Sequence, residues 1–115
     1  MIDNLHDDSL SELLKAVSDT TRRSLLTKLC QQGTCRVTDL AQYYDMSLNA
    51  VSKHIKILEK AGLVTRKTIG RTHWIDADLD QVSVMENWFY ELKSIWELRL
   101  DKLNDILKNG DNEND

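Results

Sequence analysis

The sequence predicts a mostly α-helical domain with one small β-hairpin, in the element order ααααββα. Two observations predict this class. The 115 residues include no proline and only four glycines, so helices meet few breaks. Apolar residues recur every three or four positions over most of the chain, except in two short β-prone runs around Gly70. This length is sufficient for one compact core.

Five helices are expected, from apolar residues at helical spacing together with cap residues. Ser47, for example, can cap a helix that Gly62 stops. The hairpin follows, with strands over 63–68 and 72–76. The five expected helices cover residues 9–17, 19–33, 39–44, 48–61 and 82–108.

We expect one domain, with its body in residues 9–81 and a long C-terminal helix over 82–108. The ends, residues 1–8 and 109–115, are predicted to be flexible, because the acidic tail has no apolar residue to bury. No apolar run approaches the ~20 residues needed to span a bilayer, and no signal-peptide core is present. A cytoplasmic location is therefore expected.

The charge is unevenly distributed. The formal net charge of −4, taken alone, argues against a nucleic-acid partner. Within residues 47–73, however, six lysines and arginines stand against one acid. A concentrated positive field on an acidic body suits a protein that presents one face to phosphate and stays soluble elsewhere.

The helix expected over 48–61 has two different faces. An arc of four apolar residues forms the expected core face: Leu48, Val51, Ile55 and Leu58. The opposite arc and its flanks hold small, polar and basic residues: Asn49, Ala50, Lys53, Lys56 and Lys60, with Ser52 and His54 on the flanks. A major groove accepts such a helix, with hydrogen-bonding side chains near its N-terminus and cations beside them. This pattern alone fits a solvated helix with solubilising lysines equally well.

The neighbouring elements favour DNA. A short helix and a tight turn precede this helix, which is the helix-turn-helix layout, and the hairpin after it carries cations near its tip. Such a wing can reach the DNA backbone or minor groove. We therefore predict a winged helix-turn-helix. The predicted DNA-contacting residues are Ser47, Asn49, Ala50, Ser52, Lys53, His54, Lys56, Arg66, Lys67, Arg71 and Thr72.

These segments resemble those of a known family. Residues 46–64, MSLNAVSKHIKILEKAGLV, resemble the recognition helix and exit strand of ArsR-type winged-helix repressors. Residues 19–23 are similar to the family's Asp-Pro-Thr-Arg-Arg motif, with Thr20 in place of proline. Residues 70–74 resemble the wing, and residues 88–103 resemble the last helix of a metal-free branch. The resemblance implies a dimeric repressor whose two recognition helices enter successive major grooves of a partly palindromic operator.

The last expected helix carries one apolar stripe. Its members are spaced 4, 3, 4, 4, 3 and 4 residues apart: Met85, Phe89, Leu92, Trp96, Leu100, Leu103 and Leu107. So long a stripe buries poorly on a small domain, and large apolar surface usually marks an interface. The alternative is packing within one chain. We expect pairing of the first and last helices of two copies. The predicted dimer interface comprises Leu10, Leu13, Met85, Trp88, Phe89, Leu92, Trp96, Leu100 and Leu103.

No metal site or cofactor is expected. One ArsR class places a Cys-x-Cys pair just before an Asp-Leu in the third helix, but here Asp39 follows Arg-Val-Thr, and Cys35 lies one place outside the pattern. Another class uses Asp and His ligands on the last helix, which has no histidine here. Cys30 and Cys35 could form a redox pair, although inert thiols fit better because only Arg36 would aid ionisation.

The sequence thus predicts a nucleoid-associated repressor that binds double-stranded DNA as a homodimer, with no membrane partner and no inducer that the sequence identifies. The alternative is a winged helix that binds protein and has no DNA affinity. The sequence contains no nucleophile–base arrangement, phosphate loop or set of metal ligands, so we do not expect an enzyme.

Overall fold

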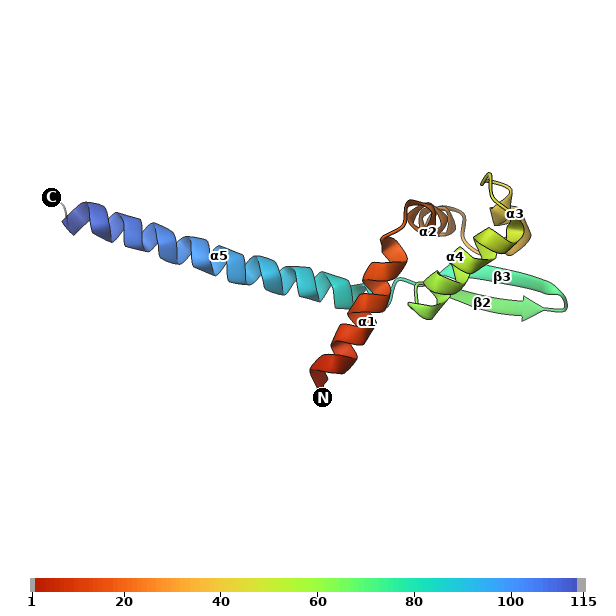
Figure 1. Cartoon of the computed structure of the whole chain (residues 1–115), viewed down its shortest axis with the longest axis horizontal. Helices are drawn as coiled ribbons and strands as arrows, with labels where there is room; N and C mark the ends of the chain where they lie inside the picture. The colour runs from red at the N-terminus through yellow and green to blue at the C-terminus, as the bar shows by residue number, and fades with distance from the viewer. Residues whose placement is uncertain (1, 114–115) are drawn as a thin grey trace. The chain divides into compact units, whose positions relative to one another are not determined.

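The computed structural model describes the backbone of residues 2–113 and the side chains of residues 8–110. Its helices and strands follow one another as Figure 1 shows. They are α1 (Ile2–Val17), α2 (Thr20–Gln32), β1 (Cys35–Arg36), α3 (Val37–Ala41), α4 (Leu48–Lys60), β2 (Val64–Ile69), β3 (Thr72–Ala77) and α5 (Val82–Glu113). The chain divides into a unit over Met1–Met85 and a second unit over Glu86–Asp115. None of the described helices is both long enough and apolar enough to cross a membrane.

The predicted mostly helical class is confirmed, with one added strand. The sheet has the antiparallel order β1-β3-β2, and Cys35 pairs with Ile75 in its first ladder. The two residues of β1 are too few to show the alternation that marks a strand, so only the pairing with β3 reveals them. Helix α3 also begins at Val37 and ends at Ala41, earlier than the expected 39–44.

The first and last helices are longer than predicted. Helix α1 begins at Ile2, where residues 1–8 had been expected to be flexible, and α5 ends at Glu113 rather than residue 108. Lengthening an existing helix needs no new nucleus, so a helix can continue beyond the residues whose spacing predicts it. The remaining part of the predicted flexible ends, Met1 and residues 114–115, lies outside the described residues.

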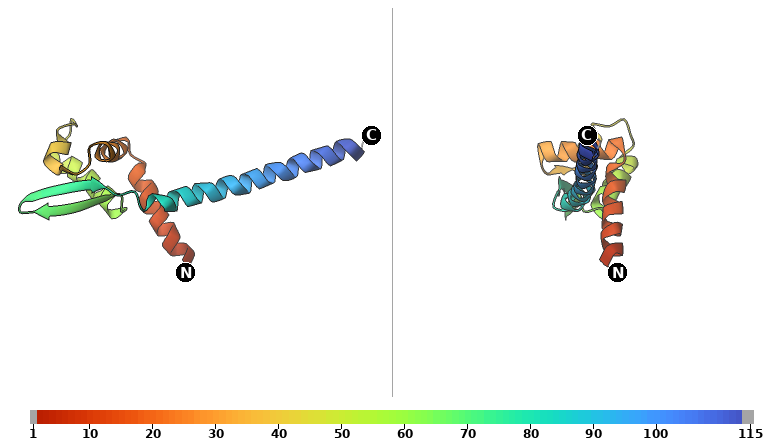
Figure 2. Two further views of the ribbon diagram at one scale, coloured as in Figure 1. Left: turned by 180° about the vertical axis from the view of Figure 1, so that it is seen from behind. Right: turned by 90° about the vertical axis from the view of Figure 1, so that its left-hand side faces the viewer.

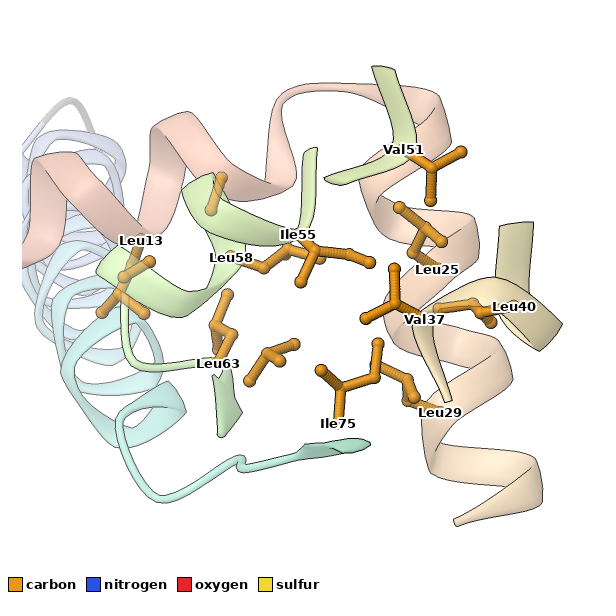
Figure 3. Close-up of a cluster of buried hydrophobic side chains, with 13 residues drawn as sticks. Leu13, Leu25, Leu29, Val37, Leu40, Val51, Ile55, Leu58, Leu63 and Ile75 are labelled. Atoms are coloured by element: carbon orange, nitrogen blue, oxygen red, sulfur yellow. The ribbon is translucent and has the colours of Figure 1, made fainter. Parts of the chain in front are cut away.

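The core of the first unit gathers apolar side chains from α1, α2, α3, α4 and the sheet (Figure 3). The predicted inward face of α4 is confirmed at Val51, Ile55 and Leu58, which are all fully buried. Leu48 was expected beside them, and this prediction is wrong because the side chain is 47% exposed. Leu48 is the first residue of α4, so it lies beyond the reach of the core.

Strands β2 and β3 form a two-stranded ribbon (Figure 2). Its end pair joins Ile69 to Thr72, so the connecting loop is Gly70-Arg71. Gly70 has a φ of +63°, and no other residue type has a positive φ in the described chain. A positive φ at the first central position alone defines a type II′ turn, which matches the twist of paired strands. The turn therefore places Arg71 at the tip of the wing.

Gly62 ends α4 in a Schellman motif. The Gly62 N–H donates to the Glu59 carbonyl at 3.0 Å, and the Leu63 N–H donates to the Leu58 carbonyl at 2.9 Å. Gly62 has a φ of +79°, and an added Cβ would lie 3.0 Å from Cγ of Gln81.

Replacing Gly62 with alanine is therefore expected to lower the free energy of unfolding by about 1–2 kcal/mol, because an L side chain is strained at this φ. Chemical denaturation measures the change. Adding Gln81→Ala to the variant separates the contact from the backbone strain, since only the contact is relieved. An unchanged unfolding midpoint for Gly62→Ala would contradict this account of the helix end.

Candidate nucleic-acid interface

Helix α4 presents a polar, basic face to solvent. Ser47 caps the helix, and its Oγ accepts the Ala50 N–H at 3.1 Å. Asn49, Lys53 and Lys56 are exposed, whereas Ala50, Ser52 and His54 are half-buried. An amide and hydroxyls thus lie at the N-terminal end of α4, where the helix dipole is positive, and lysines follow along the same helix.

The wing carries two kinds of cation. Lys67 and Arg71 are exposed, and Thr72 beside them is half-buried. Arg66 differs, because its Nε lies 3.3 Å from each carboxylate oxygen of Glu59 and its side chain is only 20% exposed. Since Glu59 belongs to α4, this pair fixes the ribbon against the helix and neutralises much of the Arg66 charge.

A cavity of about 190 Å³ lies where the N-terminal end of α4 meets the wing. Its lining comes from β1, α3, α4, and the strands and turn of the wing: Arg36, Val37, Thr38, Leu48, Ser52, Arg66, Arg71, Thr72 and His73. Arg36 is held by Asp39 at 2.8 Å and Arg66 by Glu59. Among the described residues no acid pairs with Arg71. Its positive charge is therefore available to bind a phosphate. Leu48, the misplaced core residue, forms part of the cavity wall.

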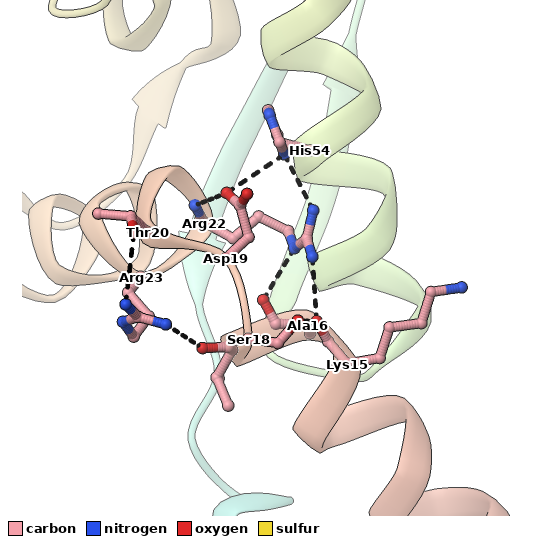
Figure 4. Close-up of polar contacts among 9 residues, drawn as sticks. Lys15, Ala16, Ser18, Asp19, Thr20, Arg22, Arg23 and His54 are labelled. Atoms are coloured by element: carbon pink, nitrogen blue, oxygen red, sulfur yellow. Dashed lines mark hydrogen bonds and ion pairs between the residues drawn. The ribbon is translucent and has the colours of Figure 1, made fainter.

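His54 lies in a network at the corner between α1 and α2, which Figure 4 shows. Its Nδ1 is 3.1 Å from Nη1 of Arg22 and 3.8 Å from Oδ2 of Asp19, and its side chain is 19% exposed. His54 had been predicted to contact DNA from the flank of α4. In the structure, however, the Nδ1 edge of its ring contacts Arg22 inside the protein.

Arg22 is the one charged residue buried among the described side chains. Its Nε donates to the Ala16 carbonyl at 2.8 Å and its Nη2 to the Lys15 carbonyl at 3.0 Å, so it caps the last turn of α1. Asp19 in turn caps α2 by accepting the Arg22 N–H at 3.0 Å. That backbone hydrogen bond, with the charge of Arg22, holds the pKa of Asp19 below its usual value.

Sequence reasoning missed the role of Arg22. The residue belongs to the Asp-Thr-Thr-Arg-Arg motif, which is the only sequence signal that singled it out. Periodicity identifies which residues turn inward, but it does not identify a partner 32 residues away.

The two cysteines are free thiols. Cys30 is exposed and Cys35 is half-buried. Burial, followed by the nearby charges of Asp39 and Asp76, raises the pKa of the Cys35 thiol, which disfavours the reactive thiolate. Within the described part of the chain, no three histidine, cysteine or acidic side chains converge in a way that could hold a metal ion.

The predicted dimer-interface residues fall into three groups. Leu13 is fully buried in the core of the first unit, so its assignment to an interface is wrong. Leu10, Met85 and Trp88 are half-buried. The others are exposed on α5, which is one helix without a core of its own: Phe89, Leu92, Trp96, Leu100 and Leu103.

Comparisons with known proteins agree with these features. The family model described as bacterial regulatory protein, arsR family, matches residues 19–66. The Arsenical resistance operon repressor of Bacillus subtilis (strain 168) is 33% identical over 84 residues, which are 67% of this chain and 80% of that protein. A crystal structure of an ArsR family transcriptional regulator has a TM-score of 0.75 at 31% identity, and the match covers 79% of this chain and 93% of that one. An ArsR-like transcriptional regulator from Rhodococcus sp. RHA1 has a TM-score of 0.74 at 26% identity, covering 86% and 92%.

The fold and the site define a winged helix-turn-helix transcriptional regulator. The chain belongs to the ArsR family. The predicted fold class and the family resemblance are thereby confirmed.

Proposed function

We propose that this protein is a repressor that binds a partly palindromic DNA operator as a homodimer, a role that places it at the nucleoid. The observation that carries the proposal is the cavity between α4 and the wing. Ser52 of α4 and Arg71 and Thr72 of the wing line the same cavity, so one strand of DNA backbone can contact both elements at once.

Two kinds of contact divide the site. Asn49 and Ser52 lie near the start of α4, where amide and hydroxyl groups can read base edges in a major groove. Lys53, Lys56, Lys67 and Arg71 supply the charge for phosphates or a narrow minor groove. We omit Arg66 and His54 from the proposed DNA contacts, because Arg66 pairs with Glu59 and His54 contacts Arg22 inside the protein.

The apolar stripe of α5 supports the homodimer. From Phe89 to Leu107 its side chains are exposed, with Trp96 at 52% and Leu103 at 51% exposure. The stripe repeats after eleven residues: Met85 to Trp96, Phe89 to Leu100, Leu92 to Leu103, and Trp96 to Leu107. An 11-residue repeat keeps one face of a helix aligned over its length, so two such helices can stay in contact without a left-handed supercoil. We infer that a second copy of the chain covers this face.

A salt series on two duplexes tests the proposal. One duplex carries an inverted repeat from the DNA beside the protein's own gene, and the other is the same fragment scrambled. We expect tighter binding to the first and a steep fall of both affinities with salt, because phosphate contacts release counterions. Equal, salt-independent affinity or no binding would instead favour the protein-interaction module.

We expect no metal inducer. Titration with zinc, cadmium, nickel or arsenite in the presence of reductant should leave the operator affinity unchanged, because thiolate and imidazole ligands must converge in threes or fours to hold such ions. Fluorescence anisotropy measures the affinity. A tenfold loss at stoichiometric metal would show that the chain does hold a ligand set.

A further inference from the structure

We propose that His54 is a positioning residue for the recognition helix, acting through its Nδ1 as the acceptor that ties α4 to the buried Arg22, and that protonation of this nitrogen releases α4. His54 lies on α4 among residues proposed to contact DNA. Its Nδ1, however, lies 3.1 Å from Nη1 of Arg22. The affinity readouts of this role rest on the proposed DNA binding.

The chemistry of the pair fixes the state of the ring. A guanidinium has five N–H donors and no acceptor, so the Nδ1 of His54 must accept. The imidazole is then neutral, with its proton on Nε2. Arg22 itself is held firmly, since it is 8% exposed and its other nitrogens donate to the Lys15 and Ala16 carbonyls at the end of α1. The contact therefore joins α4 to the corner of α1 and α2.

Protonation would turn this acceptor into a donor that faces another donor. Among the described residues, the acid that pairs with the ring is Asp19, whose Oδ2 is 3.8 Å from Nδ1. Because its pKa is held below the usual value, chiefly by the Arg22 backbone N–H, Asp19 remains ionised at mildly acidic pH. A protonated His54 is thus attracted by the Asp19 carboxylate and repelled by the Arg22 guanidinium.

The other charged groups near this corner are directed elsewhere. On α1, Glu12 pairs with Lys60 at 3.7 Å and Lys15 is exposed. On α2, Arg23 donates to the Val17 carbonyl at 2.7 Å. Lys53, the neighbour of His54 on α4, is exposed. Arg22 and Asp19 are therefore the charges that decide which way His54 turns.

Two substitutions separate positioning from DNA contact. In His54→Asn the amide oxygen takes the place of Nδ1, whereas in His54→Gln the amide nitrogen takes the place of Nε2. If His54 positions α4, the Asn variant should bind operator within about threefold of the wild type, and the Gln variant should lose about tenfold, the usual effect of losing a hydrogen bond to a charged group. Retention by Gln with loss in Asn, retention by both, or equal loss in both would overturn the proposal.

A pH series gives an independent readout. Protonation of Nδ1 removes the acceptor, so wild-type affinity should fall as the pH is lowered from about 8 to about 5.5, by several-fold more than that of His54→Asn. The comparison is repeated in a His73→Asn background, because His73 lines the cavity proposed to contact DNA, and the effect of His54→Asn on the pH profile should persist there. Identical pH profiles for the wild type and His54→Asn would count against the role.

Nitrogen NMR of the free protein keeps this inference separate from the proposed function. At pH 8 the Nδ1 of His54 should show the signal of an unprotonated acceptor, and chemical denaturation should find His54→Asn more stable than His54→Gln. If no DNA is bound but both results hold, the DNA-binding proposal fails and the His54–Arg22 contact stands. A protonated Nδ1 at pH 8 would overturn the contact whatever the protein binds.

Discussion

Replacing Trp96 with aspartate is expected to convert the proposed dimer into monomers and to weaken operator binding by about 100-fold or more, because each half-site alone supports little affinity. The 11-residue repeat on α5 relates Trp96 to Met85 before it and to Leu107 after it, and Trp96 is 52% exposed in the single chain. In a symmetric dimer each substitution counts twice, and each one places a carboxylate in an apolar interface. Sedimentation measures the mass and fluorescence anisotropy measures the affinity.

Leu98→Asp is the matched control for this experiment. Leu98 is two residues from Trp96, which is ~200° around the helix, so it lies on the opposite face of α5. Its side chain is 65% exposed, and the substitution has the same chemistry in the same helix. We expect Leu98→Asp to leave the dimer intact. If both variants dissociate equally, or if the wild type sediments as a ~13 kDa species, the assignment of the stripe is wrong.

Local signals predicted the parts of this fold that local chemistry determines. The cap of α4 is one such part, since Ser47 was assigned by its residue type and its Oγ accepts the Ala50 N–H. Another is the wing turn, where Gly70 supplies the positive φ. The inward positions Val51, Ile55 and Leu58 followed from helical periodicity.

The features that sequence reasoning missed depend on tertiary contacts. Strand β1 exists because β3 lies beside it. The same holds for the candidate site, where charge and spacing placed Arg66 and His54 on the DNA face. Each has a partner in another element, Glu59 for Arg66 and Arg22 for His54. Outward polar and charged side chains can be predicted from sequence, but their engagement by a partner inside the protein cannot.

Asn49→Ala and Arg71→Ala should separate base reading from phosphate binding. Asn49 lies exposed in the first turn of α4, so its removal is expected to cost roughly 1–3 kcal/mol on the operator and almost nothing on scrambled DNA. Arg71 at the wing tip lacks an acidic partner among the described residues, so Arg71→Ala should weaken both duplexes by similar factors. It should also flatten the plot of log affinity against log salt by about one unit for each phosphate that the dimer no longer neutralises.

The matched control for Arg71→Ala is Arg36→Ala. Both arginines line the same cavity, but Arg36 is bound to Asp39 at 2.8 Å. Removing Arg36 also frees the Asp39 carboxylate, so a small loss of affinity without the change in salt slope is expected. If Asn49→Ala weakens both duplexes equally, α4 enters the groove in a different register from the one proposed. If Arg36→Ala alters the salt slope as much as Arg71→Ala does, the charge of the cavity as a whole binds phosphate, and the wing tip has no special part in it.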